Sequence, residues 1–242
     1  MNEQSVILIT GGSEGLGFAC ANALLAKGHT VCLLARSEEK LHAAQTRLEQ
    51  TYDTQRIFCI SADVSDPAAT HKAAQEILRR FGKIDVLINA AGCSMHQPAV
   101  LEEVSTEDYL RIMRTNTDGT FFMTQAVLPS MKAHNSGFIL NILSTAAHSA
   151  GSGNSPYSAS KFAALAITDT LAAECQGTGV RISSVSPGPI ATTIWSHKAT
   201  PPSEEQKAKM LKPTELADIL LFILERPANV HLSHLQVTPW YF

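Results

Sequence analysis

Short apolar runs alternate with segments of helical periodicity along the whole chain. The runs that we predict to be strands lie at 5–10, 31–35, 56–61, 84–88, 138–143, 180–185 and 234–238. Between them, apolar residues recur with the spacing of helix faces. Most of the runs are continuous rather than alternating, which is typical of strands covered on both faces. The pattern predicts an α/β fold with a doubly wound parallel β-sheet of about seven strands and helices on both faces.

The helices between these runs carry recognisable start and stop signals. Ser37 is followed by two acidic residues, Asp66 is followed by Pro67, and Gly82 follows a helical pattern. Side-chain oxygens cap the first turn of a helix, and glycine often ends it. We predict a helix that ends before Gly28, one that follows Ser37, and others at 67–81, 106–132, 156–175, 203–210 and 213–224. No compositional linker interrupts the alternation, so we expect residues 1–242 to form a single domain.

The clearest candidate chemistry lies at the start of the helix at 156–175. We expect Ser155 to cap this helix and Pro156 to lie in its first turn, so that Tyr157 and Lys161 share one helix face. A nearby ammonium stabilises a phenolate, and the pKa of Tyr157 is therefore expected to fall toward the range of acid-base catalysis. Many Tyr-Lys pairs at this spacing are solvated or packed pairs, so this one indicates catalysis only together with other motifs.

A glycine-rich turn joins the first predicted strand to the first helix. Gly11, Gly15 and Gly17 follow Thr10 in the pattern Thr-Gly-x-x-x-Gly-x-Gly. Such a turn lets the backbone approach a pyrophosphate and directs it to the positive end of the helix. A plain turn with helix-capping glycines is the alternative. With the strand pattern, the turn predicts a Rossmann-like dinucleotide-binding domain.

The residue after the second strand bears on the choice of dinucleotide. An acidic residue there binds the ribose of NAD, whereas an arginine accommodates the 2′-phosphate of NADP. Arg36 occupies this place, so the sequence predicts NADP(H). The alternative is that Arg36 is an ordinary surface residue. Glu14 in the glycine turn would repel a 2′-phosphate, but we expect it to turn outward at the helix start, where the helix dipole favours a negative charge.

Composition narrows the classes of partner. The 242 residues carry a formal net charge of −3 and are 45% hydrophobic and 17% charged, which favours small molecules over nucleic acid or an anionic membrane. The five cysteines are odd in number and lack metal-ligand spacing, so we expect reduced thiols in a cytoplasmic protein and no bound metal. We recognise no signal sequence and no membrane span of about 20 apolar residues.

Five motifs in a fixed order make this sequence similar to the short-chain dehydrogenase/reductase family over essentially its whole length. They are Thr10-Gly11-x-x-x-Gly15-x-Gly17, Asp63, Asn89-Ala90-Ala91-Gly92, Ser144 thirteen residues before Tyr157-x-x-x-Lys161, and Pro187-Gly188 with Thr192. Two features depart from the family pattern. Ala90 stands where the family has a second Asn, and the last strand lacks the frequent Asp-Gly-Gly lead-in.

The resemblance implies roles for individual residues. The implied catalytic residues are Asn116, Ser144, Tyr157 and Lys161. Ser144 resembles the anchor of the substrate carbonyl, Tyr157 the acid/base, and Lys161 the residue that lowers the tyrosine pKa and holds the nicotinamide ribose. Asn116 resembles the residue that holds a water between the lysine and solvent.

The resemblance also implies a cofactor site that extends over most of the motifs. Asp63 resembles the adenine contact of the family, and Asn89 resembles the residue that steadies the central sheet. The implied cofactor-binding residues are Thr10, Gly11, Ser13, Glu14, Gly15, Leu16, Gly17, Arg36, Asp63, Val64, Asn89, Ala90, Ala91, Gly92, Tyr157, Lys161, Pro187, Gly188, Ile190 and Thr192.

The activity that the resemblance implies is NADP(H)-dependent hydride transfer between nicotinamide and a carbonyl or alcohol substrate, with ketone or aldehyde reduction favoured. The protein then has to orient the carbonyl and deliver a proton. One alternative is a non-catalytic dinucleotide-sensing protein on the same fold. Another is a nucleotide-sugar epimerase or dehydratase, whose relatives use a different glycine spacing and a further C-terminal substrate region.

The substrate pocket and the quaternary structure are expectations of the same kind. We expect the pocket to be lined by Met95, His96, Thr145, His148 and, from a short substrate lid at about 189–212, Ile194, Trp195 and Met210. His148 fits a loop or packing role better than a catalytic one. The lid is brief, so an open pocket is expected. In the family, the helices at 106–132 and 156–175 pack against a second subunit, which implies a homodimer or homotetramer.

Overall fold

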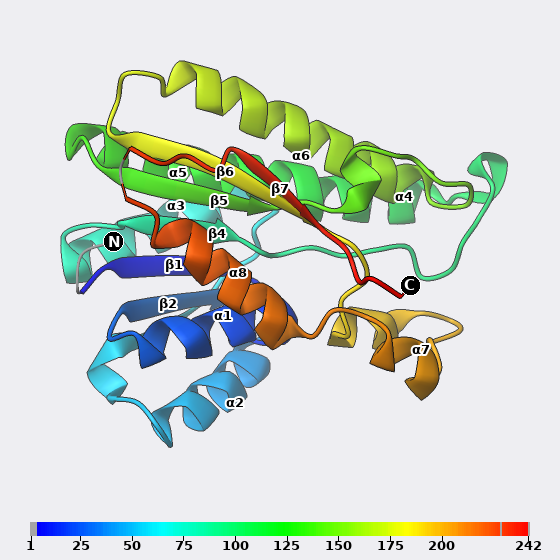
Figure 1. Ribbon diagram of the computed structural model, residues 1–242, viewed down its shortest axis with the longest axis horizontal. Coiled ribbons are helices and arrows are strands. Elements are labelled where there is room, and N and C mark those ends of the chain that lie inside the picture. Colours follow the sequence, from blue (N-terminus) through cyan, green and yellow to red (C-terminus); the bar gives the residue numbers. More distant parts are fainter. Residues whose placement is uncertain (1–3, 228, 242) are drawn as a thin grey trace.

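The computed structural model describes residues 4–227 and 229–241, and within them a sheet of seven parallel strands forms the centre of the molecule (Figure 1). The strands are β1 (Val6–Thr10), β2 (Thr30–Ala35), β3 (Ile57–Ser61), β4 (Val86–Asn89), β5 (Gly137–Ile142), β6 (Val180–Pro187) and β7 (His234–Val237). Their order is β3-β2-β1-β4-β5-β6-β7, which reverses between β1 and β4. Open parallel sheets bind ligands beyond the carboxyl ends of the strands at such a reversal.

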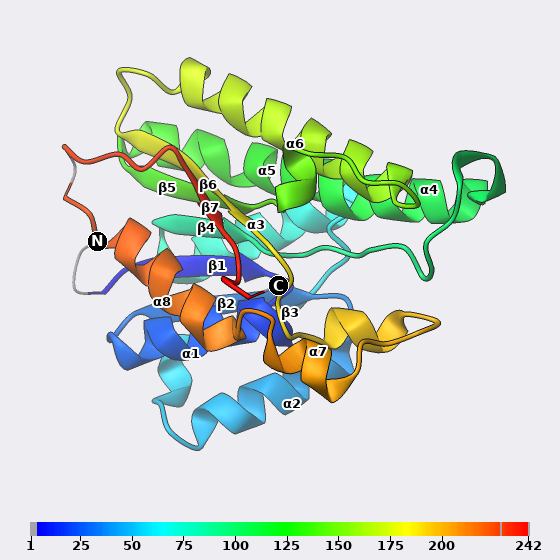
Figure 2. The same cartoon turned by 45° about the vertical axis from the view of Figure 1, so that its right-hand side comes forward.

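Helices cover both faces of the sheet (Figures 1 and 2). They are α1 (Gly15–Ala26), α2 (Glu38–Glu49), α3 (Pro67–Phe81), α4 (Thr106–Met113), α5 (Gly119–Ala133), α6 (Ser155–Glu174), α7 (Glu204–Ala208) and α8 (Pro213–Leu224). α1, α2 and α8 bury apolar side chains against one face, and α3, α5 and α6 bury theirs against the other. This is the predicted Rossmann-like arrangement, and it is confirmed.

Several helix boundaries follow capping residues. Ser37 Oγ accepts a 3.2 Å hydrogen bond from Lys40 N at the start of α2, and Asp66 Oδ1 accepts a 2.8 Å bond from Ala68 N at the start of α3. Gly82 ends α3 with φ +76°, in the left-handed region that glycine tolerates best. These boundaries are decided locally, which is why the sequence predicts them.

The start of α6 differs from the prediction. The N-cap residue is Asn154 and not Ser155, which is already helical and whose Oγ is buried without a hydrogen-bond partner among the described residues. Asn and Ser have about equal N-cap preference, so the preceding chain decides between them. Gly153, at φ +76°, turns the chain into the helix, and its carbonyl accepts a hydrogen bond from Ala99 N. Pro156 lies in the first turn as expected.

The long helix predicted at 106–132 is interrupted. α4 ends at Met113, a π-helical turn covers Arg114–Asp118, and α5 begins at Gly119. A π turn inserts one extra residue and shifts the apolar spacing only slightly, so periodicity does not reveal it. Such turns are frequent at functional sites, and this one carries Asn116.

Three further observations concern membrane spans, metal ligands and cysteines. None of the helices in the described part of the chain has the length and apolar character that a bilayer crossing requires. Residues 4–227 and 229–241 contain no group of three His, Cys, Asp or Glu side chains placed to hold a metal ion. All five cysteines are free thiols.

Candidate active site

The motif residues meet beyond the carboxyl ends of the central strands. The glycine turn follows β1, the Asn89-Ala90-Ala91-Gly92 segment follows β4, Ser144 lies just after β5, and Pro187 ends β6. Because the strands are parallel, these ends lie at one edge of the sheet, which is the right-hand edge in Figure 1. Segments far apart in sequence are thereby brought to one place.

Tyr157, Lys161 and Ser144 come together at this edge. Lys161 Nζ lies 5.8 Å from the centroid of the Tyr157 ring and donates a 3.0 Å hydrogen bond to Ile142 O at the end of β5. Ser144 is hydrogen-bonded to the Tyr157 hydroxyl. Lys161 is only 6% exposed. A hydroxyl, a phenol and an ammonium are thus assembled from two elements of the fold.

Burial sets the acid-base properties of this group. Removal from water raises the pKa of Tyr157, and the hydrogen bond with Ser144 only partly opposes the rise. Burial also lowers the pKa of Lys161, to about 8. The expected lowering of the Tyr157 pKa is therefore not found in this structure, because the loss of phenolate hydration is the largest cause of the shift. Tyr157 is a protonated acid at neutral pH.

Asn116 connects the π turn to the loop after β4. Its Oδ1 accepts a 2.8 Å hydrogen bond from Cys93 N, and its Nδ2 donates 2.9 Å bonds to Cys93 O and Ser160 Oγ. These bonds hold the loop in place. The loop lies beside the buried ammonium, since a Cβ added to Gly92 would be 3.8 Å from Lys161 Nζ. Asn116 therefore positions the loop, and the water implied between it and the lysine stays a prediction.

A chain of hydrogen-bonded buried amides and hydroxyls joins the strands and helices that carry the site. Asn89 Nδ2 donates to Thr124 Oγ1 at 3.1 Å and to Asn141 Oδ1 at 2.9 Å, and Asn141 Nδ2 donates to Thr168 Oγ1 at 2.9 Å. These bonds join β4, β5, α5 and α6. Hydrogen bonds between buried polar groups favour one arrangement, although Asn89 Oδ1 is itself buried without a partner among the described residues. The implied role of Asn89 in steadying the central sheet agrees with this geometry.

The glycine turn is packed too closely to admit side chains. A Cβ on Gly17 would lie 2.3 Å from Gly11 O, and a Cβ on Gly11, whose φ is +67°, would lie 2.9 Å from Ala91 Cα. Thr10 Oγ1 accepts 3.1 Å hydrogen bonds from Ala90 N and Ala91 N, which ties β1 to the loop after β4. The glycine pattern thus has a definite steric cause, and it leaves a bare backbone surface.

This surface fits the diphosphate of a dinucleotide. The N-cap residue of α1 is Glu14, whose side chain does not cap the helix, and the first turn of α1 holds no acidic residue. The free N–H groups and the positive dipole at such a helix end attract anions. Thr192 lies against the same turn, since a Cβ on Gly15 would be 3.3 Å from Thr192 Cβ. Ser13 lies within the turn, whereas the side chains of Leu16 and Val64 are buried in the apolar core.

Two exposed ion pairs lie where β2 and β3 end. Arg36 Nη1 is 3.7 Å from Asp63 Oδ2, and Lys40 Nζ is 3.0 Å and 3.2 Å from the two carboxylate oxygens of Glu14. Glu14 therefore pairs with a lysine of α2 while its carboxylate stays exposed to water. Sequence reasoning missed Lys40, although its place four residues after Arg36, in the first turn of a helix, was a usable signal.

The turn after β6 is held from two sides. Gly188 N donates a 2.7 Å hydrogen bond to Val237 O in β7, and Trp195 Nε1 donates a 2.6 Å bond to Ile190 O. Ile190 also forms a parallel bridge with Leu211. β7 thus secures the Pro187-Gly188 turn without the family's usual lead-in sequence.

The segment at 189–212 folds as a 3₁₀ turn (Thr193–His197) followed by α7. It is fastened to the loop after β4, since Ala199 N donates a 2.9 Å hydrogen bond to His96 O and Lys198 Nζ donates a 3.0 Å bond to Ser94 Oγ. His96 Nδ1 is hydrogen-bonded to His197 O. Of the expected pocket residues, Met95 and Met210 are buried, and Thr145 and Ile194 are partly buried.

His148 lies beside the site without entering the catalytic group. Its Nε2 is 2.9 Å from Ser186 Oγ, and its ring centroid is 4.6 Å from that of His234 in β7. Burial and the His148 ring lower the pKa of His234, with burial the larger cause. The packing role expected for His148 agrees with these contacts.

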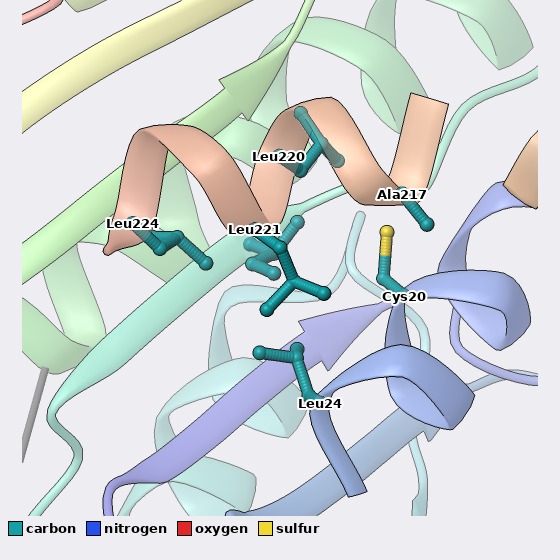
Figure 3. A pocket seen from close by; sticks show the side chains of 7 residues that line it. Cys20, Leu24, Ala217, Leu220, Leu221 and Leu224 are labelled. Atoms are coloured by element: carbon teal, nitrogen blue, oxygen red, sulfur yellow. The ribbon is translucent and has the colours of Figure 1, made fainter. Parts of the chain in front are cut away.

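A separate pocket lies between α1 and α8, and its lining explains why it is no candidate site. Figure 3 shows the thiol of Cys20 on α1 pointing toward α8 among leucine side chains. The lining residues are Cys20, Leu24, Ile88, Ala217, Leu220, Leu221 and Leu224, and the pocket leaves no room for a water molecule. Burial raises the pKa of Cys20 to about 12. An apolar gap with an unreactive thiol is a feature of core packing.

Comparisons with known proteins identify the family of this chain. The sequence profile of a family described as short chain dehydrogenase matches residues 5–202. A D-threitol dehydrogenase of Mycolicibacterium smegmatis is 36% identical over 209 residues, which are 86% of this chain and 78% of that protein. An uncharacterized oxidoreductase of Staphylococcus haemolyticus is 30% identical over 97% of this chain and 96% of its own.

Solved structures of dehydrogenases share the fold of this chain over nearly its whole length. An alcohol dehydrogenase from the archaeon Thermococcus sibiricus, complexed with 5-hydroxy-NADP, superposes with a TM-score of 0.87 at 29% identity and covers 99% of this chain and 98% of its own. The closed form of a serine dehydrogenase, complexed with NADP+, superposes with a TM-score of 0.85 at 28% identity over 96% of this chain and 93% of its own.

Proposed function

Because the short chain dehydrogenase profile covers residues 5–202, this chain belongs to the short-chain dehydrogenase family of oxidoreductases, and we propose that it is an NADPH-dependent reductase of ketones or aldehydes. The observation that supports this most directly is the meeting of Ser144, Tyr157 and Lys161 at the same end of the sheet as the closely packed glycine turn. The domain at 1–242 then acts as one catalytic unit, in which the segment at about 189–212 is the substrate lid.

Each catalytic side chain has a distinct task in this proposal. The nicotinamide, when bound, supplies the hydride. Ser144 donates a hydrogen bond to the substrate carbonyl oxygen, and Tyr157, which is protonated at neutral pH, delivers a proton to that oxygen. Lys161 holds the ribose and, with a pKa near 8, exchanges protons in the working range. Oxidation of an alcohol is the same path in reverse.

The cofactor contacts follow the same logic. The uncapped start of α1 and the glycine turn receive the diphosphate, Asp63 and Val64 border the adenine, and Pro187, Gly188, Ile190 and Thr192 border the nicotinamide. The hydrogen bonds from Ala90 N and Ala91 N to Thr10 Oγ1 hold the segment Asn89-Ala90-Ala91-Gly92 in place between the diphosphate and nicotinamide ends of this site.

We assign NADP(H) rather than NAD(H) on electrostatic grounds. Arg36 is 62% exposed, and its 3.7 Å contact with Asp63 is too long for a strong pair, so its planar guanidinium is free to meet a 2′-phosphate with two hydrogen bonds. Glu14, an acid of the glycine turn that would repel this phosphate, is already paired with Lys40. The NADP complexes of the alcohol dehydrogenase and serine dehydrogenase relatives support the assignment.

Two further proposals concern the oligomeric state of the enzyme and its place in the cell. Four large apolar side chains, Tyr109, Leu110, Phe121 and Phe162, are exposed on α4, α5 and α6. Exposed apolar side chains that gather on packed helices are typical of subunit interfaces, so we propose a homodimer or homotetramer through these helices. The five free thiols fit the reducing cytoplasm. A sedimentation experiment at micromolar concentration that finds only monomers would reject the oligomer.

The proposed function is tested by following the nicotinamide absorbance of the purified protein with NADPH or NADH and a panel of ketones and aldehydes. We expect oxidation of NADPH that depends on the carbonyl and is slower with NADH. Tight NADPH binding without turnover of any carbonyl would instead indicate a dinucleotide-sensing protein. Turnover of nucleotide sugars without net change in the absorbance would indicate an epimerase.

A further inference from the structure

Lys198 carries an ammonium that no carboxylate in the described part of the chain balances. Its Nζ donates a 3.0 Å hydrogen bond to Ser94 Oγ and lies 5.9 Å from the centroid of a Trp195 ring. No Asp or Glu oxygen of residues 4–227 and 229–241 lies within 4.0 Å of it. Burial, with the Arg111 charge as the smaller cause, lowers the pKa of Lys198. An ammonium has three donors, so two remain for a ligand.

A second cation approaches the same serine. Arg111 Nη2 donates a 3.2 Å hydrogen bond to Ser94 O, and the same guanidinium pairs with Asp108. Ser94 is thus contacted by a cation from α4 and a cation from the lid, and Asp108 is the one carboxylate of the described residues that forms an ion pair with either cation. The local excess is one positive charge, and a partly buried excess charge attracts an anion strongly because water screens it poorly.

This excess charge lies close to the proposed reaction centre. Ser94 is two residues after Gly92, where an added Cβ would lie 3.8 Å from Lys161 Nζ. Two residues of extended chain span at most about 7 Å. Cys93, between them, is fixed by its hydrogen bonds with Asn116. The lid ammonium and the catalytic ammonium therefore border the same short loop.

The position of Lys198 is fixed by contacts on both sides of it. Trp195, three residues earlier, donates from its Nε1 to Ile190 O at 2.6 Å, and Lys198 N donates to Trp195 O at 3.2 Å. Ala199 N, one residue later, donates to His96 O at 2.9 Å. A side chain that is held in place before binding loses less entropy when it meets its ligand.

We propose that the substrate is a short-chain oxo acid, or the hydroxy acid formed from it, and that Lys198 binds its carboxylate. This inference rests on the reductase function proposed above and names its substrate class. A carboxylate carries the single negative charge that the Lys198, Arg111 and Asp108 group lacks, whereas a phosphate ester brings nearly two. Lys198 is then a specificity-determining residue that takes no part in hydride or proton transfer.

The experiment compares each acid with its uncharged counterpart. Steady-state kcat/KM with saturating NADPH is measured for 2-, 3- and 4-oxo acids of four to six carbons and for their methyl esters. We expect the wild type to reduce at least one acid more than tenfold better than its ester. Lys198→Met should lower the acid-to-ester ratio at least tenfold through a higher KM for the acid, and Lys198→Arg should restore most of it. Lys72→Met, an exposed lysine of α3, is the matched charge control.

Each other outcome rejects a defined statement. Equal losses for acid and ester in Lys198→Met would mean that Lys198 only fastens the lid, and a wild type without preference for acids would reject the oxo acid. A preference for phosphorylated ketones over oxo acids would reject the carboxylate. If the wild type reduces no carbonyl at all, charged or neutral, the reductase function itself fails, and this inference fails with it.

Discussion

The two ends of the proposed dinucleotide site use charge in opposite ways. At the adenine end, Glu14, Arg36, Lys40 and Asp63 form ion pairs that are exposed to water. At the nicotinamide end, Asn116, Ser144, Tyr157 and Lys161 are partly or fully buried, and the pKa values of the tyrosine and the lysine are strongly affected by burial. Exposed pairs contribute little to stability, whereas a buried charge is costly and reactive.

Because of this difference, we expect substitutions at the adenine end to leave the catalytic group unaffected. An exposed residue such as Arg36 is replaceable with little effect on folding, so the choice of cofactor can be altered without disturbing the catalytic group. Lys161 is enclosed by β5 and the loop after β4, so its replacement affects catalysis and stability together. The predictions below test this contrast, beginning with the largest effect.

Tyr157→Phe should lower kcat about 10²–10⁴-fold, because it removes the proton that is delivered to the substrate. NADPH affinity, measured by fluorescence titration, should change little, because the ring and its packing remain. Tyr109→Phe, on the exposed side of α4, is the matched control and should retain full activity. If Tyr157→Phe keeps more than about a tenth of wild-type turnover, its assignment as the general acid is wrong.

Lys161→Met should abolish turnover and raise stability. The pKa of this ammonium is about 8 in the folded chain and is ordinarily 10.5, so the unfolded chain binds the proton more tightly and the charge destabilises the folded protein at pH 7. Removing it should raise the free energy of unfolding at pH 7 by up to about 3 kcal/mol, since one pKa unit corresponds to about 1.4 kcal/mol.

The same shift gives the wild type a characteristic pH dependence. Between pH 8 and pH 10.5 its stability should rise with pH through this group, because the folded chain has lost the proton that the unfolded chain still binds. Urea denaturation of wild type and Lys161→Met at several pH values tests this, with the exposed Lys132→Met as control. A Met variant that is less stable at pH 7 would contradict the proposed cost of burial.

Arg36→Ala should weaken NADPH binding by about 1.5–3 kcal/mol, the contribution of a hydrogen bond to a charged group, and leave NADH binding nearly unchanged. Folding stability should change by less than about 0.5 kcal/mol, because the side chain is exposed. Titration of both cofactors measures the effect, and Arg79→Ala on α3 controls for loss of charge. Equal losses for the two cofactors, or a wild type that prefers NADH, would reject the NADP(H) assignment.

Lys40→Met should have the smallest effect, a loss of about 0.5–1 kcal/mol in NADPH affinity, because Glu14 is left unpaired near the 2′-phosphate. Glu14→Gln in the same chain should restore the affinity, since the repelling charge is then absent. The coupling between the two changes is read from a double-mutant cycle. If Glu14→Gln gives no recovery, Lys40 contacts the phosphate directly or takes no part in binding.

The elements whose signals are local were predictable. Continuous apolar runs gave the strands, and capping residues such as Asp66 and Gly82 gave helix ends that match the structure. The glycine motif was equally readable, because its cause is steric exclusion within a few residues of chain, as at Gly17. The motif set also placed Tyr157 and Lys161 on one helix face, as the structure has them.

The features that escaped prediction depend on distant parts of the chain. The π turn around Asn116 is fixed by bonds to Cys93 and Ser160, which lie on other elements. The partner of Glu14 is a lysine 26 positions away. The N-cap of α6 depends on how the loop before it is attached to Ala99. None of these contacts leaves a mark on local periodicity.

The sequence by itself determined the order of strands and helices along the chain and the family. It also determined which kinds of side chain are present at the site. These features depend on side-chain pattern and short-range sterics. Only the tertiary structure decided the protonation of those groups. Tyr157 and Lys161 have the same spacing in any helix, but burial raises the pKa of one and lowers that of the other. Hydration is lost only when the sheet, the helices and the loop after β4 close around them, and hydration controls the free energy of a charge.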